Sequence, residues 1–433
     1  MSKYQELYNQ KKVSVDEAIS RVKSGDIIHT SLCAMEPMTL LANLHKAAEA
    51  GKKDITITTA LEMRTYPFNS DPQYSNAIHP VSMFLLPPAR KQYLAGIIDY
   101  SPTDLHNISL KRFQHKCPNI ALIAATPMDS HGYVRCSLSQ LLEGELLDVC
   151  ERIIIEVNPN YPVVGGDTAI HISQIDCLIE TNTPVPQLPA AQITDIDKTI
   201  GAYVAELIND GDTIQLGIGG MPDAAAMALV NKKNLGVHTE MISSSIAELV
   251  EKGVINGSKK SLRKGKIVAT FVLGDQKLYD TLNNNPGAEI LRASYVNDPF
   301  VIAQNDNMVS VNSCIGIDLM GQVCSESIAT SQYSGTGGAS DFAFGASRSK
   351  NGRCIIAVHS TTKNDEISAI TSALPPASIV SIRRNFVDYV VTEYGIAKLT
   401  GRDVKERVEN LIAIAHPNFR EQLKAEAKKL NLH

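Results

Sequence analysis

Short apolar runs alternate with amphipathic runs along the chain. The short runs are rich in β-branched residues and predict buried strands at 55–61, 120–125, 153–157 and 176–181. The amphipathic runs repeat apolar residues every three or four positions and predict helices at 16–24, 38–50, 198–210, 224–230 and 420–432. Strands interleaved with helices predict an α/β fold with mainly parallel sheets.

The two halves of the chain repeat one another. Four short segments of the first half recur in the same order in the second half, and they begin at Ser24, Asp129, Arg152 and Ile175. Their counterparts begin at Asp210, Asp318, Arg353 and Val387, so that the offset rises through 186, 189, 201 and 212 residues. A steadily rising offset is typical of a duplicated domain whose second copy gained loop residues.

The duplication predicts two similar open α/β domains, 1–190 and 191–433, with the active site in the cleft between them. We place the boundary at Pro184–Ala191, where prolines interrupt the periodic pattern. The length of 433 residues agrees with two domains. Single hydrophobic cores stop growing at about 250–300 residues.

Composition narrows the class of protein. The net charge of −5 gives no overall attraction to polyanions, so we do not expect nucleic acid as a partner. The N-terminus is polar, and no apolar run reaches the roughly 18 residues that span a bilayer. We therefore expect a cytoplasmic protein with no membrane segment. The cysteines form no C-x-x-C pair and the histidines show no metal-ligand spacing, so we expect no metal site.

A glycine turn at the end of a predicted strand is the most informative segment. Glycines stand at Gly217, Gly219 and Gly220, and Pro222 suits the first turn of a helix. Three interpretations stay open, namely a tight turn, a cradle for phosphate or acyl-CoA, and a dinucleotide-binding site. Glu240 lies at a suitable distance for the dinucleotide motif, but Pro222 replaces the third glycine that this motif requires.

A glutamate and a second glycine cluster follow this turn. Glu240 stands between a short apolar run and a predicted helix capped by one of the serines at 243–245. Taken alone, it is typical of a solvated charge at the end of a strand. The run 334–342 carries Gly335, Gly337 and Gly338, so we expect neither a regular strand nor a helix there. Such a run is either a flexible turn or a nest of backbone N–H donors facing an anion.

These segments belong to a longer series of motifs. In chain order the series reads QLGIGGMPDA, LGVHTEMIS, KIVATFVLG, NDNMVSVNSC, DLMGQVCSES, SGTGGASDF and VVTEYGIAKLTG. With it, the chain from about residue 10 to its end resembles the acetyl-CoA hydrolase/transferase family of CoA-transferases. The resemblance implies two open α/β domains, a homodimer, and acyl-CoA and small carboxylic acids such as 4-hydroxybutyrate or butyrate as substrates. It implies no cofactor, because coenzyme A is itself a substrate.

The resemblance also implies roles for single residues. Glu240 matches the catalytic nucleophile, Gly338 matches a backbone N–H donor of the oxyanion hole, and Asn312 matches an asparagine near the acyl group. The positions that match CoA-binding residues are Gln215, Gly217, Ile218, Gly219, Gly220, Met221, Gly338 and Lys350. Ser31 resembles a position that contacts the substrate carboxylate.

The implied reaction is covalent catalysis in ping-pong order. The Glu240 carboxylate attacks the thioester, and the released thiolate then attacks the glutamyl carbonyl to leave an enzyme–CoA thioester, which a second acid resolves. Hydrolysis of the same intermediate, as in an acetyl-CoA hydrolase, is the first alternative. A dinucleotide-dependent oxidoreductase and a non-catalytic acyl-CoA-binding sensor are the others.

Overall fold

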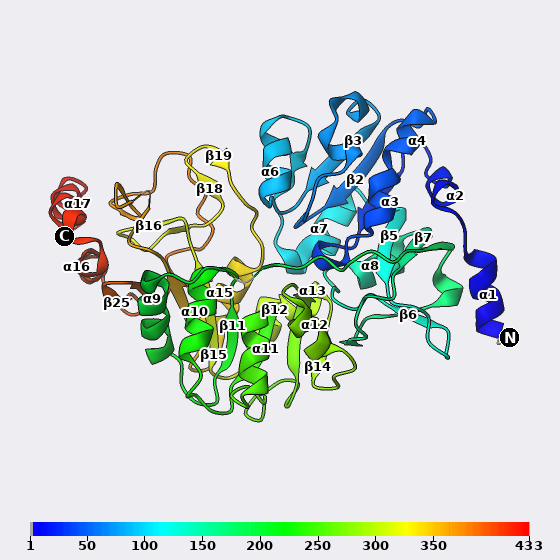
Figure 1. Ribbon diagram of the computed structural model, residues 1–433. Helices are drawn as coiled ribbons and strands as arrows, with labels where there is room; N and C mark the ends of the chain where they lie inside the picture. The colour runs from blue at the N-terminus through cyan, green and yellow to red at the C-terminus, as the bar shows by residue number, and fades with distance from the viewer. Residues whose placement is uncertain (1–2, 190, 363, 433) are drawn as a thin grey trace. The chain divides into compact units, whose positions relative to one another are not determined.

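The computed structural model describes residues 3–189, 191–362 and 364–432 (Figure 1). These residues form two compact units. The N-terminal unit holds the described residues up to Pro189 together with Val268–Val296, and the C-terminal unit holds the others. The predicted division at 190/191 therefore differs from the compact units in the segment 268–296. In this segment the Tyr279 hydroxyl donates to the backbone oxygen of Pro186 at 2.7 Å, which ties the segment to the N-terminal unit.

The N-terminal unit alternates strands with helices. Its strands are β1 (Ile27–Thr30), β2 (Ile55–Thr59), β3 (Ile78–Ser82), β4 (Asp99–Tyr100), β5 (Ile120–Ala125), β6 (Tyr133–Arg135), β7 (Arg152–Val157), β8 (Gly165–Gly166), β9 (Ala169–His171), β10 (Cys177–Glu180), β13 (Ile267–Val272) and β14 (Ala288–Ile290). Its α-helices are α1 (Lys3–Lys11), α2 (Val15–Ser20), α3 (Met38–Asn43), α4 (His45–Glu49), α5 (Pro67–Ser70), α6 (Pro87–Leu94), α7 (Ile108–His115), α8 (Glu143–Val149), α12 (Gln276–Leu282) and α13 (Ala293–Val296). Short 3₁₀ turns lie at Cys33–Met35, Pro72–Tyr74, Leu105–Asn107 and Ile172–Gln174.

The sheet of the N-terminal unit runs in the order β10-β7-β5-β1-β2-β3-β4, and its neighbouring strands are parallel. All of β5 is buried, as the continuous apolar run 120–125 predicts for a strand covered on both faces. Apolar side chains of α2, α3 and α4 pack on the sheet and form the core of this unit. Strand β14 pairs with β8 in parallel.

The C-terminal unit has the same kind of architecture. Its strands are β11 (Thr213–Leu216), β12 (Gly236–Ile242), β15 (Met308–Ser313), β16 (Gly316–Asp318), β17 (Val323–Cys324), β18 (Ser327–Ile328), β19 (Ser331–Gln332), β20 (Arg353–Ala357), β21 (Thr361–Thr362), β22 (Ile367–Ser368), β23 (Ile370–Thr371), β24 (Tyr389–Thr392) and β25 (Gly395–Lys398). Its α-helices are α9 (Asp195–Glu206), α10 (Gly220–Ala228), α11 (Ser244–Glu251), α14 (Pro299–Ile302), α15 (Ala339–Arg348), α16 (Val404–Ile414) and α17 (Pro417–Lys429).

In this unit the strand order is β25-β24-β20-β15-β11-β12, and the neighbours are parallel except for the antiparallel edge strand β25. Helices α9 and α10 pack against each other, as Figure 1 shows beside β11. A small sheet in the order β17-β16-β23 and the hairpins β18–β19 and β21–β22 follow the carboxyl ends of β15 and β20.

The strand registers of the two units correspond. Thr30 of β1 lies opposite Leu122 of β5, and Leu216 of β11 lies opposite Val311 of β15. These two pairs are related by the offsets 186 and 189 that the sequence repeats show. The order β10-β7-β5-β1-β2 thus matches β24-β20-β15-β11-β12 residue by residue, as the duplication predicts.

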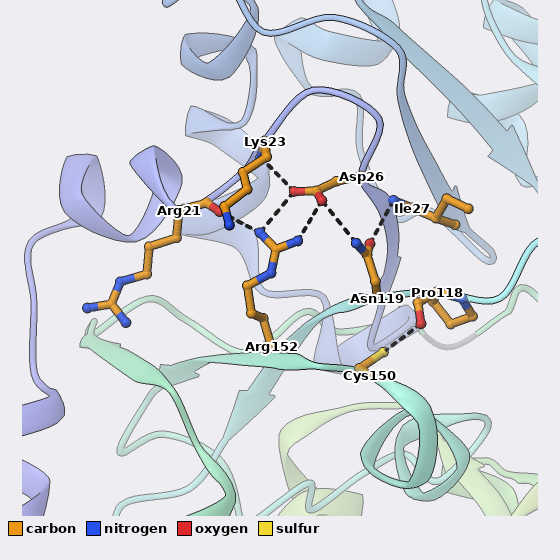
Figure 2. A network of polar contacts seen from close by, with 8 residues as sticks. All are labelled: Arg21, Lys23, Asp26, Ile27, Pro118, Asn119, Cys150 and Arg152. Atoms are coloured by element: carbon orange, nitrogen blue, oxygen red, sulfur yellow. Dashed lines mark hydrogen bonds and ion pairs between the residues drawn. The ribbon is translucent and has the colours of Figure 1, made fainter.

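A buried aspartate–arginine pair lies at the amino edge of each sheet. In the N-terminal unit, two guanidinium nitrogens of Arg152 donate to Asp26 at 3.1 and 2.5 Å, and Asn119 donates to the same carboxylate at 3.0 Å (Figure 2). In the C-terminal unit the corresponding Arg353 donates to Asp212. All four partners of the two pairs are residues of the sequence repeats, so the duplication preserves this ion pair as well as the strands.

Most predicted elements are confirmed with small shifts at their ends. The strands at 55–61, 120–125, 153–157 and 176–181 correspond to β2, β5, β7 and β10, and the helices at 198–210, 224–230 and 420–432 correspond to α9, α10 and α17. The helix predicted at 38–50 is interrupted at Leu44, and the helix predicted at 16–24 ends at Ser20 because Lys23 donates its N–H to the Asp26 carboxylate. None of the described helices combines the length and the apolar character needed to cross a bilayer.

Candidate active site

Glu240 lies near the carboxyl end of β12 in the C-terminal unit. The preceding residues Val237, His238 and Thr239 are buried, whereas Glu240 is partly exposed. The carboxyl edge of a parallel sheet is where α/β proteins usually bind their ligands. Glu240 therefore occupies a position that a substrate can reach, on a strand whose other side chains are held in the core.

Two donors hold this carboxylate in place. The Asn297 Nδ2 donates to Glu240 Oε2 at 2.9 Å, and the backbone N–H of Gly338 also donates to the carboxylate. Asn297 is fully buried, and Gly338 is the residue that caps the N-terminus of α15. Both donors are thus held in place by their packed surroundings, and the helix N-terminus adds a favourable field for negative charge.

Glycine is required at Gly338 because the site leaves no space for a side chain. Its φ of −99° is open to any residue, so backbone strain does not demand glycine. An added Cβ, however, would overlap Oε2 of Glu240 and crowd the amide of Asn297. The close approach of the backbone to the carboxylate depends on the missing side chain. The prediction that 334–342 forms neither strand nor helix is wrong for its last four residues, because Ala339–Phe342 form the first turn of α15.

The surroundings raise the pKa of Glu240 to about 7. Loss of hydration is the main cause, and the nearby charge of Asp341 acts in the same direction. The hydrogen bonds from Asn297 and Gly338 lower the pKa but only partly offset these effects. A carboxylate of this kind is more basic than an ordinary glutamate and still ionised in part near neutral pH.

The predicted glycine turn joins β11 to α10. Gly219 caps the N-terminus of α10 with a φ of 116°, a conformation that favours glycine, and an added Cβ would meet nothing within 4 Å. Ile218 is 42% exposed at the tip of the turn, and Met221 lies in the first turn of the helix. The turn therefore presents backbone N–H groups at an accessible helix N-terminus, which suits an anionic or carbonyl oxygen.

Gln215 and Asn312 lie together beneath this turn. Their side-chain amides are hydrogen-bonded to each other in both directions at 3.1 and 3.2 Å, and Ser310 joins the network at 2.9 Å from Asn312 and 2.8 Å from Gln215. The Asn312 Oδ1 would stand 3.8 Å from a Cβ at Gly217. The structure thus brings two predicted residues to the base of the glycine turn, where their amides link β11 to β15.

Lys350 does not lie near Glu240. It follows the C-terminal end of α15, whereas Gly338 precedes the N-terminal end, and a ten-residue helix is about 15 Å long. Its backbone oxygen accepts from Asn307 at 2.8 Å, where β15 begins, so it stands at the amino edge of the sheet. The exposed ammonium group lies 4.0 Å from Asp306. The predicted contact between Lys350 and CoA is not supported by this placement.

Ser31 has a structural role in the N-terminal unit. It is fully buried after β1, and its hydroxyl donates to the backbone oxygen of Met35 at 2.6 Å and accepts from Ala124 N–H at 2.9 Å. A substrate carboxylate would have to break the first of these bonds to be bound by the hydroxyl. The hydroxyl therefore stabilises the turn after β1, and the predicted contact with substrate is not supported.

Two residues of the site were missed by sequence reasoning. Asn297 stands just before α14, whose N-terminus is capped by the next residue, Asp298, and no motif marks the asparagine. Asp341 lies in the first turn of α15 and is buried. Its only signal in the sequence is its place in the run SGTGGASDF. Both act on Glu240 from segments distant in the chain, so spacing could not reveal them.

Both halves of the chain match domains of a known family. Residues 1–189 match the acetyl-CoA hydrolase/transferase N-terminal domain, and residues 274–427 match the acetyl-CoA hydrolase/transferase C-terminal domain. A protein of Clostridium kluyveri named 4-hydroxybutyrate coenzyme A transferase is 41% identical over 98% of this chain and 99% of its own. A succinyl-CoA:cyclohexane-1-carboxylate CoA transferase of Geobacter metallireducens is 38% identical over 99% of this chain and 97% of its own.

Solved structures agree with these matches. RipA from Yersinia pestis is similar with a TM-score of 0.94 at 32% identity, over 100% of both chains. A 4-hydroxybutyrate CoA-transferase from Porphyromonas gingivalis is similar with a TM-score of 0.84 at 34% identity, over 99% of this chain and 100% of the other. Two matched domains and this degree of identity along the whole chain show that the protein belongs to the acetyl-CoA hydrolase/transferase family.

Proposed function

We propose that this protein is a CoA-transferase that moves CoA from an acyl-CoA to a small carboxylic acid through a covalent intermediate on Glu240. The observation that carries the proposal is the Glu240 carboxylate, raised in pKa and held by Asn297 and Gly338. Relatives named as CoA transferases, 33–41% identical over most of the chain, support this class of reaction.

The reaction needs two displacements to load CoA onto Glu240 and two more to transfer it to the second acid. First, a Glu240 oxygen attacks the thioester carbon, the carbon–sulfur bond breaks, and an acyl-glutamyl anhydride and CoA thiolate form. The thiolate then attacks the glutamyl carbon, the anhydride bond breaks, and the first acid leaves as its carboxylate. The glutamyl-CoA thioester that remains is attacked by the second acid, and the same steps run in reverse. No electron leaves or enters the system.

The donors around Glu240 suit the second displacement. When the thiolate attacks the glutamyl carbon, negative charge develops on a glutamyl oxygen, and Asn297 and Gly338 both donate to this carboxylate group. These donors are already in place, so they stabilise the oxyanion without reorganisation. One such donor typically contributes about 3–4 kcal/mol to the transition state.

The raised pKa of Glu240 suits the first displacement. An ordinary glutamate lies about 4 pKa units below a thiol, which corresponds to about 6 kcal/mol of unfavourable basicity when a thiolate leaves. With a Glu240 pKa of about 7, this difference falls to about 2 kcal/mol. Binding of the remote parts of CoA can supply the remainder.

We propose short monocarboxylic acids such as 4-hydroxybutyrate or butyrate as acceptors and acetyl-CoA as a donor. The names of similar proteins from Clostridium kluyveri and Anaerostipes caccae, a 4-hydroxybutyrate and a butyryl-CoA:acetate enzyme, support this choice. Hydrolysis is the second candidate, since acetyl-CoA hydrolases of Neurospora crassa and Yarrowia lipolytica are 23% and 24% identical. The family resemblance further supports a cytoplasmic homodimer, which light scattering after gel filtration can test.

The covalent step is tested by mass spectrometry of protein incubated with acetyl-CoA alone. The peptide that contains Glu240 should gain the mass of CoA minus water, and Glu240→Gln protein should give no adduct. A wild-type peptide map without the adduct, from a preparation that is active in transfer, would rule out Glu240 as the covalent residue.

Transfer is separated from hydrolysis by a panel of acids. Acetyl-CoA is mixed with 4-hydroxybutyrate, butyrate, propionate or itaconate, and new acyl-CoA and free CoA are both quantified. We expect new acyl-CoA to exceed free CoA for at least one monocarboxylate. Free CoA formed at the same rate with and without every acid would favour the hydrolase.

A further inference from the structure

A cavity of about 520 Å³ lies in the C-terminal unit, beyond the carboxyl ends of β15 and β20. Its lining is apolar and hydroxylic and includes Met221 and His359. The apolar part includes Ile315, Val358 and Leu374, and the hydroxyl-bearing part includes Ser327, Thr361, Thr371 and Ser378. A cavity of this size and lining suits part of a small ligand that carries both methyl groups and neutral hydrogen-bonding groups.

His359 lines this cavity, and its ring is oriented by a contact with Asp197. Its Nε2 lies 2.8 Å from the Asp197 Oδ1, and the side chain is 37% exposed. Burial would raise the pKa of Asp197, but hydrogen bonds from Thr194 and His359 lower it, so the carboxylate is ionised. The ionised carboxylate accepts a hydrogen bond from Nε2, so Nδ1 is the ring nitrogen that is left to contact a ligand. Among the described residues, none is hydrogen-bonded to Nδ1.

Asp197 connects His359 to the glycine turn. It lies in the first turn of α9, inside a capping box with Thr194, and is buried. A Cβ added to Gly220 would stand 3.2 Å from Asp197 Oδ2, so the same carboxylate packs under the turn and orients the histidine. The position of His359 is therefore coupled to the turn that leads into α10.

The cavity and Glu240 lie at the same edge of one sheet. Glu240 is on β12 and His359 follows β20, and the strands β11 and β15 stand between them. Three strand spacings correspond to about 14 Å. A ligand group beside His359 is thus well removed from the reacting carboxylate, and an extended flexible chain is needed to connect the two.

We infer that this cavity binds the pantetheine arm of CoA and that His359, oriented by Asp197, accepts a hydrogen bond from an amide N–H or hydroxyl of its pantoyl half. The inference rests on the proposed function, which supplies a CoA thioester at Glu240. The arm has the required chemistry, because it is a flexible chain with methyl groups, amides and a hydroxyl. His359 thereby contributes to recognition of the arm without touching the reacting atoms.

The inference is tested with two variants of the same residue. Glutamine can still donate to Asp197 but lacks an acceptor at the place of Nδ1, whereas asparagine can place its oxygen near that position. We expect His359→Gln to raise KM for acetyl-CoA about five-fold with little change in kcat, as for a lost neutral hydrogen bond. His359→Asn should recover part of the loss. His115→Gln, the same substitution at an exposed histidine of α7, is the matched control and should leave KM unchanged.

Truncated thioesters locate the contact. The His359→Gln penalty should persist with S-acetyl-pantetheine and vanish with S-acetyl-N-acetylcysteamine, which lacks the pantoyl half. Calorimetry should show weaker binding of CoA and unchanged binding of adenosine 3′,5′-diphosphate. A penalty confined to CoA itself would place His359 at the nucleotide and overturn the inference. Equal penalties for all thioesters, or no penalty for any of them, would also overturn it. The Glu240 adduct is assayed separately, so failure of the proposed function is recognised by its absence from wild-type protein.

Discussion

Replacing Gly338 by alanine tests whether the backbone beside Glu240 organises the reaction. The φ of this residue is accessible to alanine, so the substitution introduces no backbone strain. The added Cβ would overlap Glu240 Oε2, about 1 Å inside the 3.0 Å separation that real Cβ atoms keep. Because the backbone is anchored at the start of α15 and Asn297 is buried, the Glu240 carboxylate is the group that has to move.

The size of this shift sets the expected effect. A displacement of about 1 Å breaks the alignment of nucleophile and donors, and misplacement on this scale typically costs about 10²-fold in rate. Loss of the Gly338 N–H as an oxyanion donor would cost a similar factor, about 10²–10³-fold. The two effects arise from one movement and are not independent, so we expect kcat to fall about 10²–10³-fold rather than by their product.

The assay combines rate, stability and binding. Transfer from acetyl-CoA to butyrate is measured beside thermal melting and calorimetric titration with CoA, and we expect only the rate to change strongly. Gly165→Ala is the control, since a Cβ there would meet its nearest neighbour at an ordinary 3.4 Å and the residue lies in β8, outside the site. A folded Gly338→Ala protein with near-normal turnover would refute the reasoning.

Three further outcomes follow from the same contacts. Glu240→Asp retracts the carboxylate by one methylene and should lower transfer about 10²-fold while hydrolysis gains relative to transfer, which the acid panel measures. The kcat/KM for acetyl-CoA should fall as pH drops through about 7, because protonation removes the Glu240 carboxylate, and Asp341→Asn should move this inflection to lower pH by removing a charge that raises the Glu240 pKa. An unshifted inflection would contradict the electrostatic coupling. Arg353→Met should destabilise the fold by roughly 3–5 kcal/mol in urea denaturation, since it leaves the buried Asp212 carboxylate without its ion-pair partner.

The pattern of apolar positions predicted four strands of the N-terminal sheet, β2, β5, β7 and β10. The run 120–125 became the fully buried β5, because a strand covered on both faces needs no polar side chain and leaves a continuous apolar signal. Helix ends were predicted less well. The helix at 16–24 stops early because the Asp26 carboxylate, a tertiary partner of Arg152, accepts the N–H of Lys23. No local pattern carries that information.

The active site was predictable only in part. Glu240 and Gly338 were named through a series of motifs. Their local pattern alone favoured an ordinary strand end for Glu240 and left both a flexible turn and an anion-binding nest open for Gly338. Asn297 was missed because its effect depends on three distant segments that meet only in the folded unit. Lys350 shows the opposite case, since it is close to Gly338 in the chain but separated from it by the length of α15.

The duplication explains why the fold is easier to predict than the chemistry. Both copies keep the aspartate–arginine pair at the amino edge, and Ser31 and Gly217 donate their N–H groups to equivalent strand residues, Leu122 and Val311. At the carboxyl edge the copies differ. The registers of β1–β2 and β11–β12 place buried Ala60 where the second copy has Glu240. The shared sheet therefore leaves matching sequence patterns in both halves of the chain. The reacting residue is present in only one half, so its role has to be argued from its own surroundings.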